Sequence, residues 1–511
     1  MTVMLQSLTG GKTMSFLDSI IAAFSPQAAY KREAFRRAYE ELRNYDAGSF
    51  NRPNQNWRAI NQSAEQTDCF SRDEVRARAR DLERNSDVLN AVVGPFRRNV
   101  VSGGFALQAK TDKPDLNKEL EHVWKRWCKK QNCDVTGRQS LMTIIRMAVQ
   151  RKKIDGGILF VKRYTKGGLV PFKLQMIEVD ELDTSVMVPR KASNKVVGGI
   201  ELNKANAPVG YYITQYDPQG FNLGNPVYVD AKDVIFYFSI RRPSQVREMS
   251  DMAPTITRVR DVNEFMLAVA VKERIEACLS VFIKKGIPTT GLGRGNDQNV
   301  TRTSYDGKMI SPGMIKELNA GDEIQVVNPS GQGADATSFT KVQQRLIGAG
   351  QGLSYEATSR DMSEATYSSA RQGMIEDDMT YEEEKALLIE VLDEIYETFV
   401  ISAVLSGVVN IPNFWDDIER YLAHEWTQEP KPWIDPQKES NANKTALQTG
   451  QKTYKQIAAE NGRDWRDQIN DMAEIIEYGK EKGIDMTPIL YGIQQQQEVT
   501  NGQNSDEEQG N

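Results

Sequence analysis

The sequence predicts an α+β protein built from several domains. It has 511 residues, and a common average of about 150 residues per domain gives three or four domains. Apolar residues recur at helical spacing in the first third of the chain, and an alternating pattern replaces it between residues 156 and 238. Two further helical patterns flank Gly352–Gly373, a stretch poor in large aliphatic side chains. Helices and strands in separate blocks are typical of α+β architecture.

The charge balance argues against tight binding of nucleic acid. The chain carries 64 basic and 70 acidic residues, which gives a net charge of −6. Proteins that grip nucleic acid usually show a basic balance. The chain therefore either avoids nucleic acid or handles it without holding it. The mean hydropathy of −0.54 fits an elongated protein or an assembly subunit better than a single compact globule.

The cysteines indicate a reducing compartment and no metal site. They are Cys69, Cys128, Cys133 and Cys278. Four cysteines in so long a chain form no disulfide framework. Two of them are spaced C-x4-C with His122 just before, but zinc needs about four ligands and the other histidine, His424, is remote in sequence. We expect buried or half-buried thiols, no metal and no cofactor.

Two other functional signals are weak. Residues 10–13 read Gly-Gly-Lys-Thr, but Gln6 stands where a phosphate-binding loop needs its first glycine, and no strand precedes it. The longest aliphatic runs fall short of the roughly 20 residues that a membrane-spanning helix needs. No signal peptide is evident. We expect a disordered leader over residues 1–13, and no integral membrane protein.

Helices are predicted first. Ser25–Pro26 precedes a helix from Gln27 to about Tyr45, followed by an extended arm over 46–67. Ser71-x-x-Glu74 has capping-box spacing and opens a helix to about Val101, with a kink or a break at Gly94–Pro95. Two more helices are expected over 115–130 and 138–153.

Strands follow from Gly156. Residues 158–164 and 172–177, separated by a Lys-Gly-Gly turn, predict a hairpin. Further strands are predicted over 196–202, 210–216, 227–229 and 234–238. The first half of the chain is therefore a helical layer with an antiparallel sheet.

Two long helical patterns dominate the second half. A helix over 255–285 would be on the order of 45 Å long, and a strand-containing insert over 286–329 separates it from a helix over 338–350. A second long helix is predicted from Met374 to Leu405, and its acidic first turns suit a helix N-terminus. Three short helices are expected over 436–450, 453–461 and 465–482, before a Gln-rich, disordered tail.

The polar stretch Gly352–Gly373 cannot bury itself, because it has few apolar side chains. We predict a loop or a lining that other copies of the chain or a ligand complete. The side chains able to make that contact are Tyr355, Arg360, Asp361, Tyr367 and Arg371.

This stretch resembles the most distinctive segment of the lambda-type phage portal proteins, Gly-x-x-Tyr-Glu…Asp-x-Ser…Tyr-Ser-Ser-x-Arg. The matching residues are Gly352, Tyr355, Glu356, Asp361, Ser363, Tyr367, Ser368, Ser369 and Arg371. Two further segments match in order, Pro312–Glu323 with Asn328–Pro329, and Asp435–Asp464. Thr366 departs from the Asn that the family tends to place before Tyr-Ser-Ser.

The resemblance implies a multi-domain portal fold that assembles as a ring, commonly of twelve subunits. The expected parts are a wing (14–252), a stem helix (253–285), a clip (286–337), a second stem helix (338–351), a tunnel loop region (352–373), a tunnel or wing helix with its connection (374–435), crown helices (436–493) and a tail (494–511).

It also implies a role and partners. Family portals conduct double-stranded DNA, without sequence specificity, during genome packaging and ejection. They dock the terminase large subunit and later head-completion or tail adaptor proteins, and they meet the major capsid and scaffold proteins. The implied location is the portal vertex of the virion capsid, and the host cytoplasm during assembly.

The charge pattern agrees with a conduit. From Gly352 to Lys385 there are nine acidic residues against three basic ones, and a lining with few cations lets DNA slide. The candidate channel residues are Arg360, Arg371, Lys341, Arg345 and Glu364. The tunnel-loop motif is Gly352, Tyr355, Glu356, Asp361 and Tyr367. The candidate contacts to terminase or adaptor on the clip are Arg294, Arg302 and Lys308. The alternative is that these charges face solvent or pair between subunits.

Two other functions were weighed. An enzyme is disfavoured, because the neighbouring carboxylates Asp377 and Asp378 do not face each other on a helix, and we expect no catalytic residues. A ring connector or scaffold protein without a role in DNA translocation stays open as the second alternative.

Overall fold

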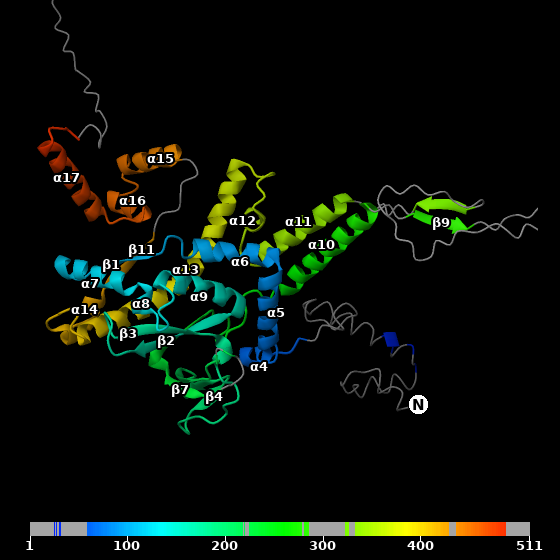
Figure 1. Cartoon of the computed structure of the whole chain (residues 1–511), viewed down its shortest axis with the longest axis horizontal. Helices are drawn as coiled ribbons and strands as arrows, with labels where there is room; N and C mark the ends of the chain where they lie inside the picture. The colour runs from blue at the N-terminus through cyan, green and yellow to red at the C-terminus, as the bar shows by residue number, and fades with distance from the viewer. Residues whose placement is uncertain are drawn as a thin grey trace, which may run out of the picture. The chain divides into compact units, whose positions relative to one another are not determined.

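The computed structural model describes residues 59–217, 219, 224–277, 281–285, 322–326, 333–428 and 436–486, with four single residues before them (Figure 1). The chain divides into the units Met1–Ser63 and Ala64–Asn511, and the fold below is that of the second unit. The predicted leader, the predicted Gln-rich tail and all but three positions of the predicted helix over 27–45 lie outside the residues that can be described. The end of the predicted arm is helical, since α4 spans Ala64–Asp68.

A layer of helices comes first, as predicted. It consists of α5 (Arg72–Asn85), α6 (Asp87–Asn99), α7 (Pro114–Trp127), α8 (Lys130–Cys133) and α9 (Leu141–Asp155). Of the kink or break predicted at Gly94–Pro95, the break is wrong, because Pro95 lies inside α6. The chain breaks instead at Ser86, whose hydroxyl accepts a hydrogen bond from Leu89 N at 3.3 Å and caps α6. Ser71 precedes α5, but its side chain makes no cap.

Two antiparallel sheets follow. The predicted hairpin is confirmed as β2 (Gly157–Tyr164) and β3 (Phe172–Ile177), and β8 (Val234–Phe238) pairs on the other side of β2. The second sheet has the order β4-β5-β6-β7, with β4 (Lys195–Val197), β5 (Ile200–Leu202), β6 (Pro208–Ile213) and β7 (Val227–Asp230). The predicted single strand over 196–202 is a tight hairpin, because Gly198 and Gly199 both take positive φ. Short 3₁₀ turns, η3 (Val179–Glu181) and η4 (Ala231–Asp233), join the sheets.

A third pair of strands was not predicted. It joins β1 (Phe105–Ala109) to β11 (His424–Gln428), more than 300 residues later. Sequence patterns within one segment cannot reveal such a pairing, because each strand has only one partner and no hairpin turn. Between the long helix α13 (Tyr367–Leu405) and β11, the chain forms η5 (Phe414–Asp416) and α14 (Ile418–Leu422).

The main core lies between the helical layer, the three-stranded sheet and the long helix α13 (Tyr367–Leu405). An aromatic group fills its centre: Trp127 stacks on Phe172 with ring centroids 5.3 Å apart, and its indole N–H donates to the Phe172 carbonyl oxygen at 2.8 Å. Trp124 meets Phe399 of α13 edge-on at 5.0 Å. Trp124 and Trp127 are both buried in this core.

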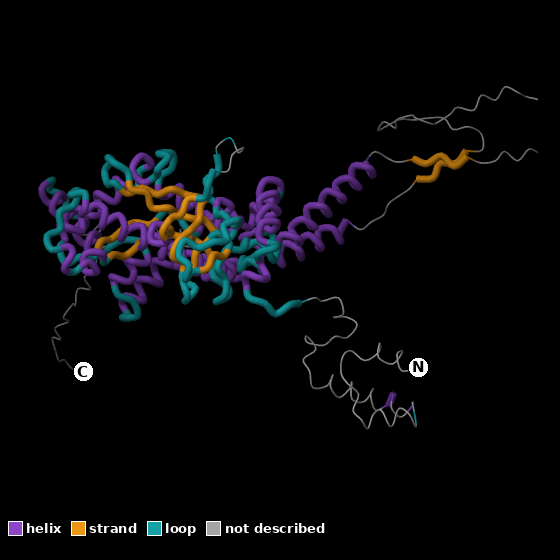
Figure 2. Tube along the Cα trace, turned by 90° about the horizontal axis from the view of Figure 1, so that it is seen from below, coloured by secondary structure: helices purple, strands orange, loops and turns teal. Residues whose placement is uncertain are grey.

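Two helices leave this body side by side (Figure 2). The outgoing helix α10 (Ile256–Ala277) is shorter than predicted, because Val281–Lys285 forms β9, paired with β10 (Asp322–Val326). The sequence of β9, Val-Phe-Ile-Lys-Lys, favours a strand through its β-branched and aromatic residues. The returning helix α11 spans Gly333–Ala349, and Phe339 packs on Phe265 of α10 with ring centroids 4.6 Å apart.

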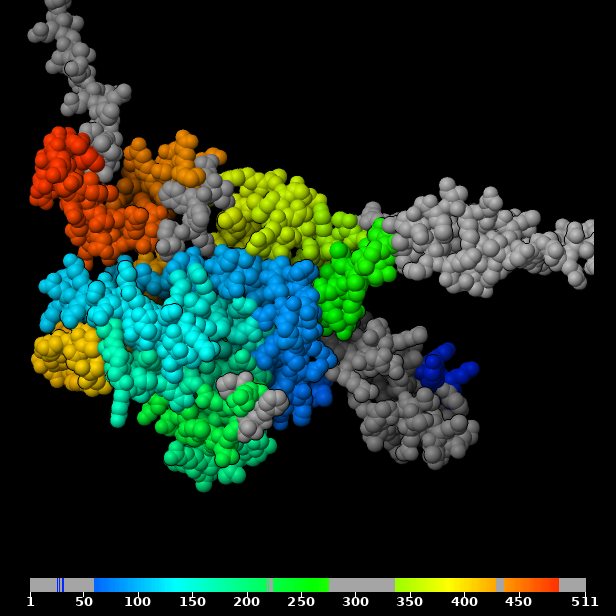
Figure 3. Space-filling model, viewed as in Figure 1, coloured from blue at the N-terminus to red at the C-terminus, as the bar shows by residue number. Residues whose placement is uncertain are grey.

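The prediction for the start of the second long helix is also wrong. Thr366 caps α13 by accepting a hydrogen bond from Ser369 N, so the helix begins at Tyr367 rather than Met374. The acidic residues from Glu376 onward therefore lie beyond its first two turns, and the helix dipole does not account for them. The three predicted C-terminal helices are confirmed as α15 (Pro436–Gln448), α16 (Tyr454–Glu460) and α17 (Trp465–Glu481), which gather on one side of the body (Figure 3).

A substitution at Gly156 tests how tightly the body is packed around the end of α9. It ends α9 with φ of +92°, and a Cβ there would lie 2.5 Å from the backbone carbon of Met249. We expect Gly156→Ala to lower the free energy of unfolding by more than about 2 kcal/mol, because a left-handed conformation alone costs an alanine about 1–2 kcal/mol. The measurement is urea denaturation followed by tryptophan fluorescence.

Gly137 supplies the matched control. Its φ is +68°, but no atom lies within 4 Å of its Cβ position. Gly137→Ala should therefore show only the conformational part of the cost. Equal losses in the two variants would contradict the close packing of Gly156 on Met249.

Candidate functional site

The predicted polar loop is largely folded. Ser354 caps the short helix α12 (Tyr355–Ser359), and the buried carboxylate of Asp377 accepts hydrogen bonds from Ser354 N at 2.6 Å and Ser354 Oγ at 2.7 Å. Burial raises the pKa of Asp377, although the two hydrogen bonds from Ser354 oppose the shift. Leu353 and Thr358 are buried as well. The irregular parts of the stretch are thus residues 352–354 and 360–366.

Gly352 has a local structural role. Its φ is +70°, and a Cβ would lie 2.7 Å from the hydroxyl oxygen of Thr380, which itself donates to the Gly352 carbonyl oxygen. Only glycine fits this turn without displacing α13. Gly352 and Asp377 therefore fix where α12 begins.

Five of the predicted residues come together between α11 and the 360–366 segment. Lys341 Nζ lies 2.7 Å from Glu364, and Arg345 lies 3.6 Å from the same carboxylate. The Arg345 guanidinium also stands over the Tyr355 ring at 5.3 Å. The Tyr355 hydroxyl donates to Asp361 at 3.3 Å.

This cluster is internally paired. The hydrogen bond with Lys341 lowers the pKa of Glu364, and it raises the pKa of Lys341. Hydrogen bonds from Ser363 lower the pKa of Asp361. Each charge in the cluster thus has an opposite charge or a hydrogen-bond donor beside it, and the group holds α11 against the 360–366 segment.

Arg360 differs from that cluster. It ends α12 in the left-handed conformation, with φ of +57°, and its side chain is exposed. It lies near two exposed arginines of α6: the pKa of Arg98 is lowered by partial burial and then by the charges of Arg360 and Arg97. Like charges held together on a surface attract an anion.

Tyr367 and Arg371 face another part of the chain. An Arg371 terminal nitrogen lies 3.4 Å from the Tyr367 hydroxyl and 4.0 Å from Glu439 of α15. The Lys438 ammonium stands over the Tyr367 ring at 5.2 Å. Tyr367 and Arg371 therefore contact the start of α15. Glu356 is half-buried beside Asp377. The clip candidates Arg294, Arg302 and Lys308 lie outside the described residues.

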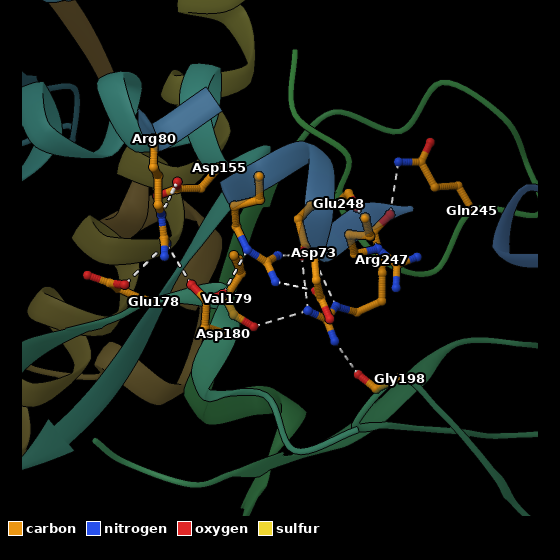
Figure 4. Close-up of polar contacts among 12 residues, drawn as sticks. Asp73, Arg80, Asp155, Glu178, Val179, Asp180, Gly198, Gln245, Arg247 and Glu248 are labelled. Atoms are coloured by element: carbon orange, nitrogen blue, oxygen red, sulfur yellow. Dashed lines mark hydrogen bonds and ion pairs between the residues drawn. The ribbon is translucent and has the colours of Figure 1, made fainter. Parts of the chain in front are cut away.

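Sequence reasoning recognised a basic connector over residues 241–252 but missed its buried charges; in the structure the connector, residues 239–255, joins β8 to α10. Its Glu248 is fully buried and accepts hydrogen bonds from Arg76 at 2.9 Å and from Arg247 at 2.8 Å (Figure 4). Arg76 also lies 2.8 Å from Asp180, while Arg80 bridges Asp180 and Asp155. The network ties α5, η3 and α9 to the connector.

A second buried network, which we call the ionic junction, sits at the far end of the connector. It consists of Lys152, Lys153, Arg241, Asp251 and Glu384. Glu384 of α13 lies 2.6 Å from Lys152 Nζ and 2.5 Å from Lys153 Nζ, and Asp251 lies 3.1 and 3.2 Å from the same two ammoniums. Arg241 reaches Asp251 at 2.7 Å. The ionic junction fixes α9 and α13 to the residues just before α10.

The charges in the ionic junction depend on one another. Burial alone would raise the pKa of Asp251, but Lys153, Lys152 and Arg241 outweigh it, and the pKa is lowered. Removing one member of a buried pair leaves the other charge unpaired, at a cost of about 3–5 kcal/mol.

One sequence signal could have revealed these networks. Arg72, Arg76, Ala79 and Leu82 are all buried and lie on one face of α5. Arg72 and Arg76 continue the buried face of Ala79 and Leu82 toward the start of α5. Arginines near a helix start are more simply interpreted as exposed to solvent. No comparable signal marks Lys152 and Lys153, which read as an ordinary basic helix end.

The described thiols, those of Cys69, Cys128 and Cys133, take no part in these networks. Burial raises the pKa of Cys128 and that of Cys133, the latter to about 12. Within the described ranges, no group of three or more His, Cys, Asp or Glu side chains could hold a metal ion. None of the helices described there is long and apolar enough to cross a membrane.

Known proteins resemble this chain along most of its length. The family model described as phage portal protein, lambda family, matches residues 50–385. The probable portal protein of Halomonas phage phiHAP-1 is 27% identical over 432 residues, covering 82% of each chain. The portal protein of Escherichia phage N15 is 19% identical over 468 residues, covering 82% of this chain and 87% of its own. Among solved structures, a chain in the neck of a native gene transfer agent particle is similar, with a TM-score of 0.40 and 15% identity over 74% of this chain and 90% of its own.

Asp251→Asn tests the ionic junction. We expect the free energy of unfolding at pH 7 to fall by about 3–5 kcal/mol, because two buried lysines lose a shared carboxylate. A lowered folded pKa gives stability that is present above the ordinary aspartate pKa of about 4 and is lost as pH falls through the folded value. The variant should therefore lose less stability than the parent protein on acidification below pH 4. Denaturation midpoints across this pH range measure both effects.

Asp112→Asn is the control for that variant. Asp112 pairs with Arg420, and both side chains are more than half exposed, so the change should leave the midpoint almost unaltered. Equal midpoints for the Asp251 and Asp112 variants would show that the ionic junction contributes nothing.

Proposed function

Because the chain belongs to the lambda family of phage portal proteins, we propose that it works as a ring at one capsid vertex, through which double-stranded DNA enters and leaves. We propose twelve subunits, as the resemblance implies. Portal proteins are structural, and the proposed role likewise includes no catalysis. The proposal accounts for features of the fold that a single copy leaves unexplained.

The observation that carries the proposal is the helix pair α10–α11. Beyond the contact between Phe265 and Phe339, the pair exposes six large apolar side chains. They are Met266, Leu267, Val271, Phe339, Val342 and Leu346, each between 40 and 61% exposed. Large exposed apolar patches mark sites of protein association. In a ring, identical helix pairs stand side by side, and each covers the apolar surface of the next.

The remaining parts follow from this arrangement. We propose that α10 and α11 form the stem, and that β9 and β10 belong to the clip, where the terminase large subunit docks before head-completion or tail adaptor proteins replace it. The body from α5 to β8 forms the wing, which meets the major capsid and scaffold proteins. The helices α15–α17 form the crown. The protein would act at the portal vertex of the virion, after assembly in the host cytoplasm.

The charge distribution of the candidate channel residues suits DNA that slides past them better than DNA that is bound tightly. Lys341 and Arg345 are already paired with Glu364, so they offer little free charge to phosphates. Arg360, beside Arg97 and Arg98, is the stronger candidate for DNA contact. We propose that Arg360 faces the channel, and that Arg371 seats the crown rather than touching DNA.

Ring formation tests the helix-pair argument. We expect Leu267→Asp to prevent ring closure, because a buried carboxylate at the contact between copies would be unpaired. Negative-stain imaging of the purified protein should show rings with a central channel for the parent chain and monomers for the variant.

Tyr164→Asp is the matched control for Leu267→Asp, since Tyr164 is 60% exposed and Leu267 is 61% exposed, and Tyr164 lies on β2 rather than on the helix pair. Rings from the Leu267 variant would contradict the proposed contact. A parent chain that never forms rings would contradict the proposed function itself.

DNA passage tests Arg360. We expect Arg360→Glu to leave rings intact and to reduce the DNA packaged per head severalfold, because a carboxylate repels phosphates. Lys204→Glu, at an exposed turn between β5 and β6, should package normally. Packaging of the Arg360 variant at the parent level would exclude a DNA contact at this position.

A further inference from the structure

The loop between η3 and β4 carries an exposed apolar tip. Residues 186–189 read Val-Met-Val-Pro, and both Met187 and Val188 are 78% exposed. Single exposed apolar side chains are common on protein surfaces. Here two highly exposed apolar side chains lie next to each other, between the half-buried Val186 and Pro189, and exposed apolar runs are unfavourable unless they bind something.

A buried carboxylate clamps the far end of this loop. Glu201 of β5 is 1% exposed, and it accepts hydrogen bonds from the backbone N–H groups of Arg190 at 2.9 Å and Lys191 at 3.2 Å. It also accepts from Asn194 Nδ2 and from the Tyr212 hydroxyl, both at 2.7 Å. Burial opposes its ionisation, but these hydrogen bonds prevail and the pKa of Glu201 is lowered.

The near end is clamped in the same way. The Asp183 carboxylate accepts from Ser185 N at 2.8 Å and from the Thr214 hydroxyl at 2.8 Å, and Asp183 N donates to the Tyr212 carbonyl oxygen at 2.9 Å. Gly199 packs closely against the Asp183 backbone, since a Cβ at position 199 would lie 2.9 Å from the Asp183 carbonyl oxygen. The loop is therefore held at both ends, and binding a partner would cost little further ordering.

The surface around the tip is positive. Arg190, Lys191 and Lys195 are exposed beside it, and Arg190 is oriented by the Tyr228 ring, 4.9 Å away. The two nearby carboxylates, Asp183 and Glu201, are occupied by the hydrogen bonds of the clamp. A complementary partner would offer an apolar pocket bordered by carboxylates.

The position of the loop between η3 and β4 indicates which kind of partner it can reach in the proposed ring. The sheet of β4 and β7, which carries the loop, lies at the opposite side of the body from α12 (Figure 1). In the proposed ring, Arg360 at the end of α12 faces the channel, so this sheet faces away from it. Neighbouring copies meet along the sides of the wing, and the outward end meets whatever encloses the ring.

From these observations we propose that the clamped loop 183–194 is an anchor, whose Val186–Pro189 tip inserts into a carboxylate-rimmed apolar pocket on a subunit of the protein shell around the ring. The inference rests on the proposed function, because the direction of the loop is defined by the ring.

The test is a double variant, Met187→Asp with Val188→Asp, co-expressed with the shell proteins. We expect rings to form normally in negative stain, and the fraction of purified heads that contain a ring to fall at least tenfold. Arg190→Glu with Lys191→Glu should lower the same fraction, through repulsion from the partner's carboxylates. Lys204→Asp with Ala205→Asp, on the exposed β5–β6 turn of the same sheet, is the control and should match the parent.

Each outcome decides the proposal. Incorporation of the Met187 and Val188 variant at the parent level would overturn it. Loss of rings in that variant would also overturn it, because the tip would then contact a second copy of this chain. A parent chain without rings would instead count against the proposed function, so the two failures remain distinguishable.

Discussion

The ionic junction is the constraint on which the rest of the structure depends. Lys152 and Lys153 are almost completely buried, and both ammonium groups pair with Asp251 and Glu384, so losing either carboxylate would leave buried charge without its partner. These four residues come from α9, the connector and α13. The junction therefore forms only when the helical layer, the end of the connector and the long helix are all in place. Because α10 begins five residues after Asp251, the direction in which the helix pair leaves the body is set there.

The molecule therefore has two parts that differ in how well their apolar side chains are buried, the body and the helix pair α10–α11. The body has a continuous core, with Trp127, Phe172 and Phe399 near its centre. Among the described side chains of α10 and α11, one aromatic contact joins the two helices, and Leu267 and Val342 are exposed. A rigid base under an incomplete helix pair suits a subunit whose assembly is finished by its neighbours, as the proposed ring requires.

Sequence patterns predicted the parts of this fold that are governed by local periodicity. The β2–β3 hairpin and the three C-terminal helices are confirmed. The predictions failed where the deciding contact is remote or subtle. The β1–β11 pair joins segments more than 300 residues apart, and the early start of α13 depends on a single hydroxyl cap from Thr366.

In the candidate site, too, features set by local sequence were predicted and features set by remote contacts were not. The segment around Gly352 was found from its composition and its resemblance, and the structure brings Lys341, Arg345, Tyr355, Asp361 and Glu364 together there. The separation of Arg371 from Arg360 could not be predicted, because it depends on α15 packing against the start of α13. The ionic junction was missed, since adjacent lysines at a helix end look solvent-exposed until the connector covers them.

The central claim is that identical copies close into a ring with the helix pairs side by side. A cryo-electron microscopy map of the assembled full-length protein tests it most directly. The account predicts a closed ring in which Leu267 and Val342 are buried between neighbouring copies and Arg360 lines the channel. A map in which the helix pairs remain solvent-exposed, or in which Arg360 lies on the outer surface, would contradict it.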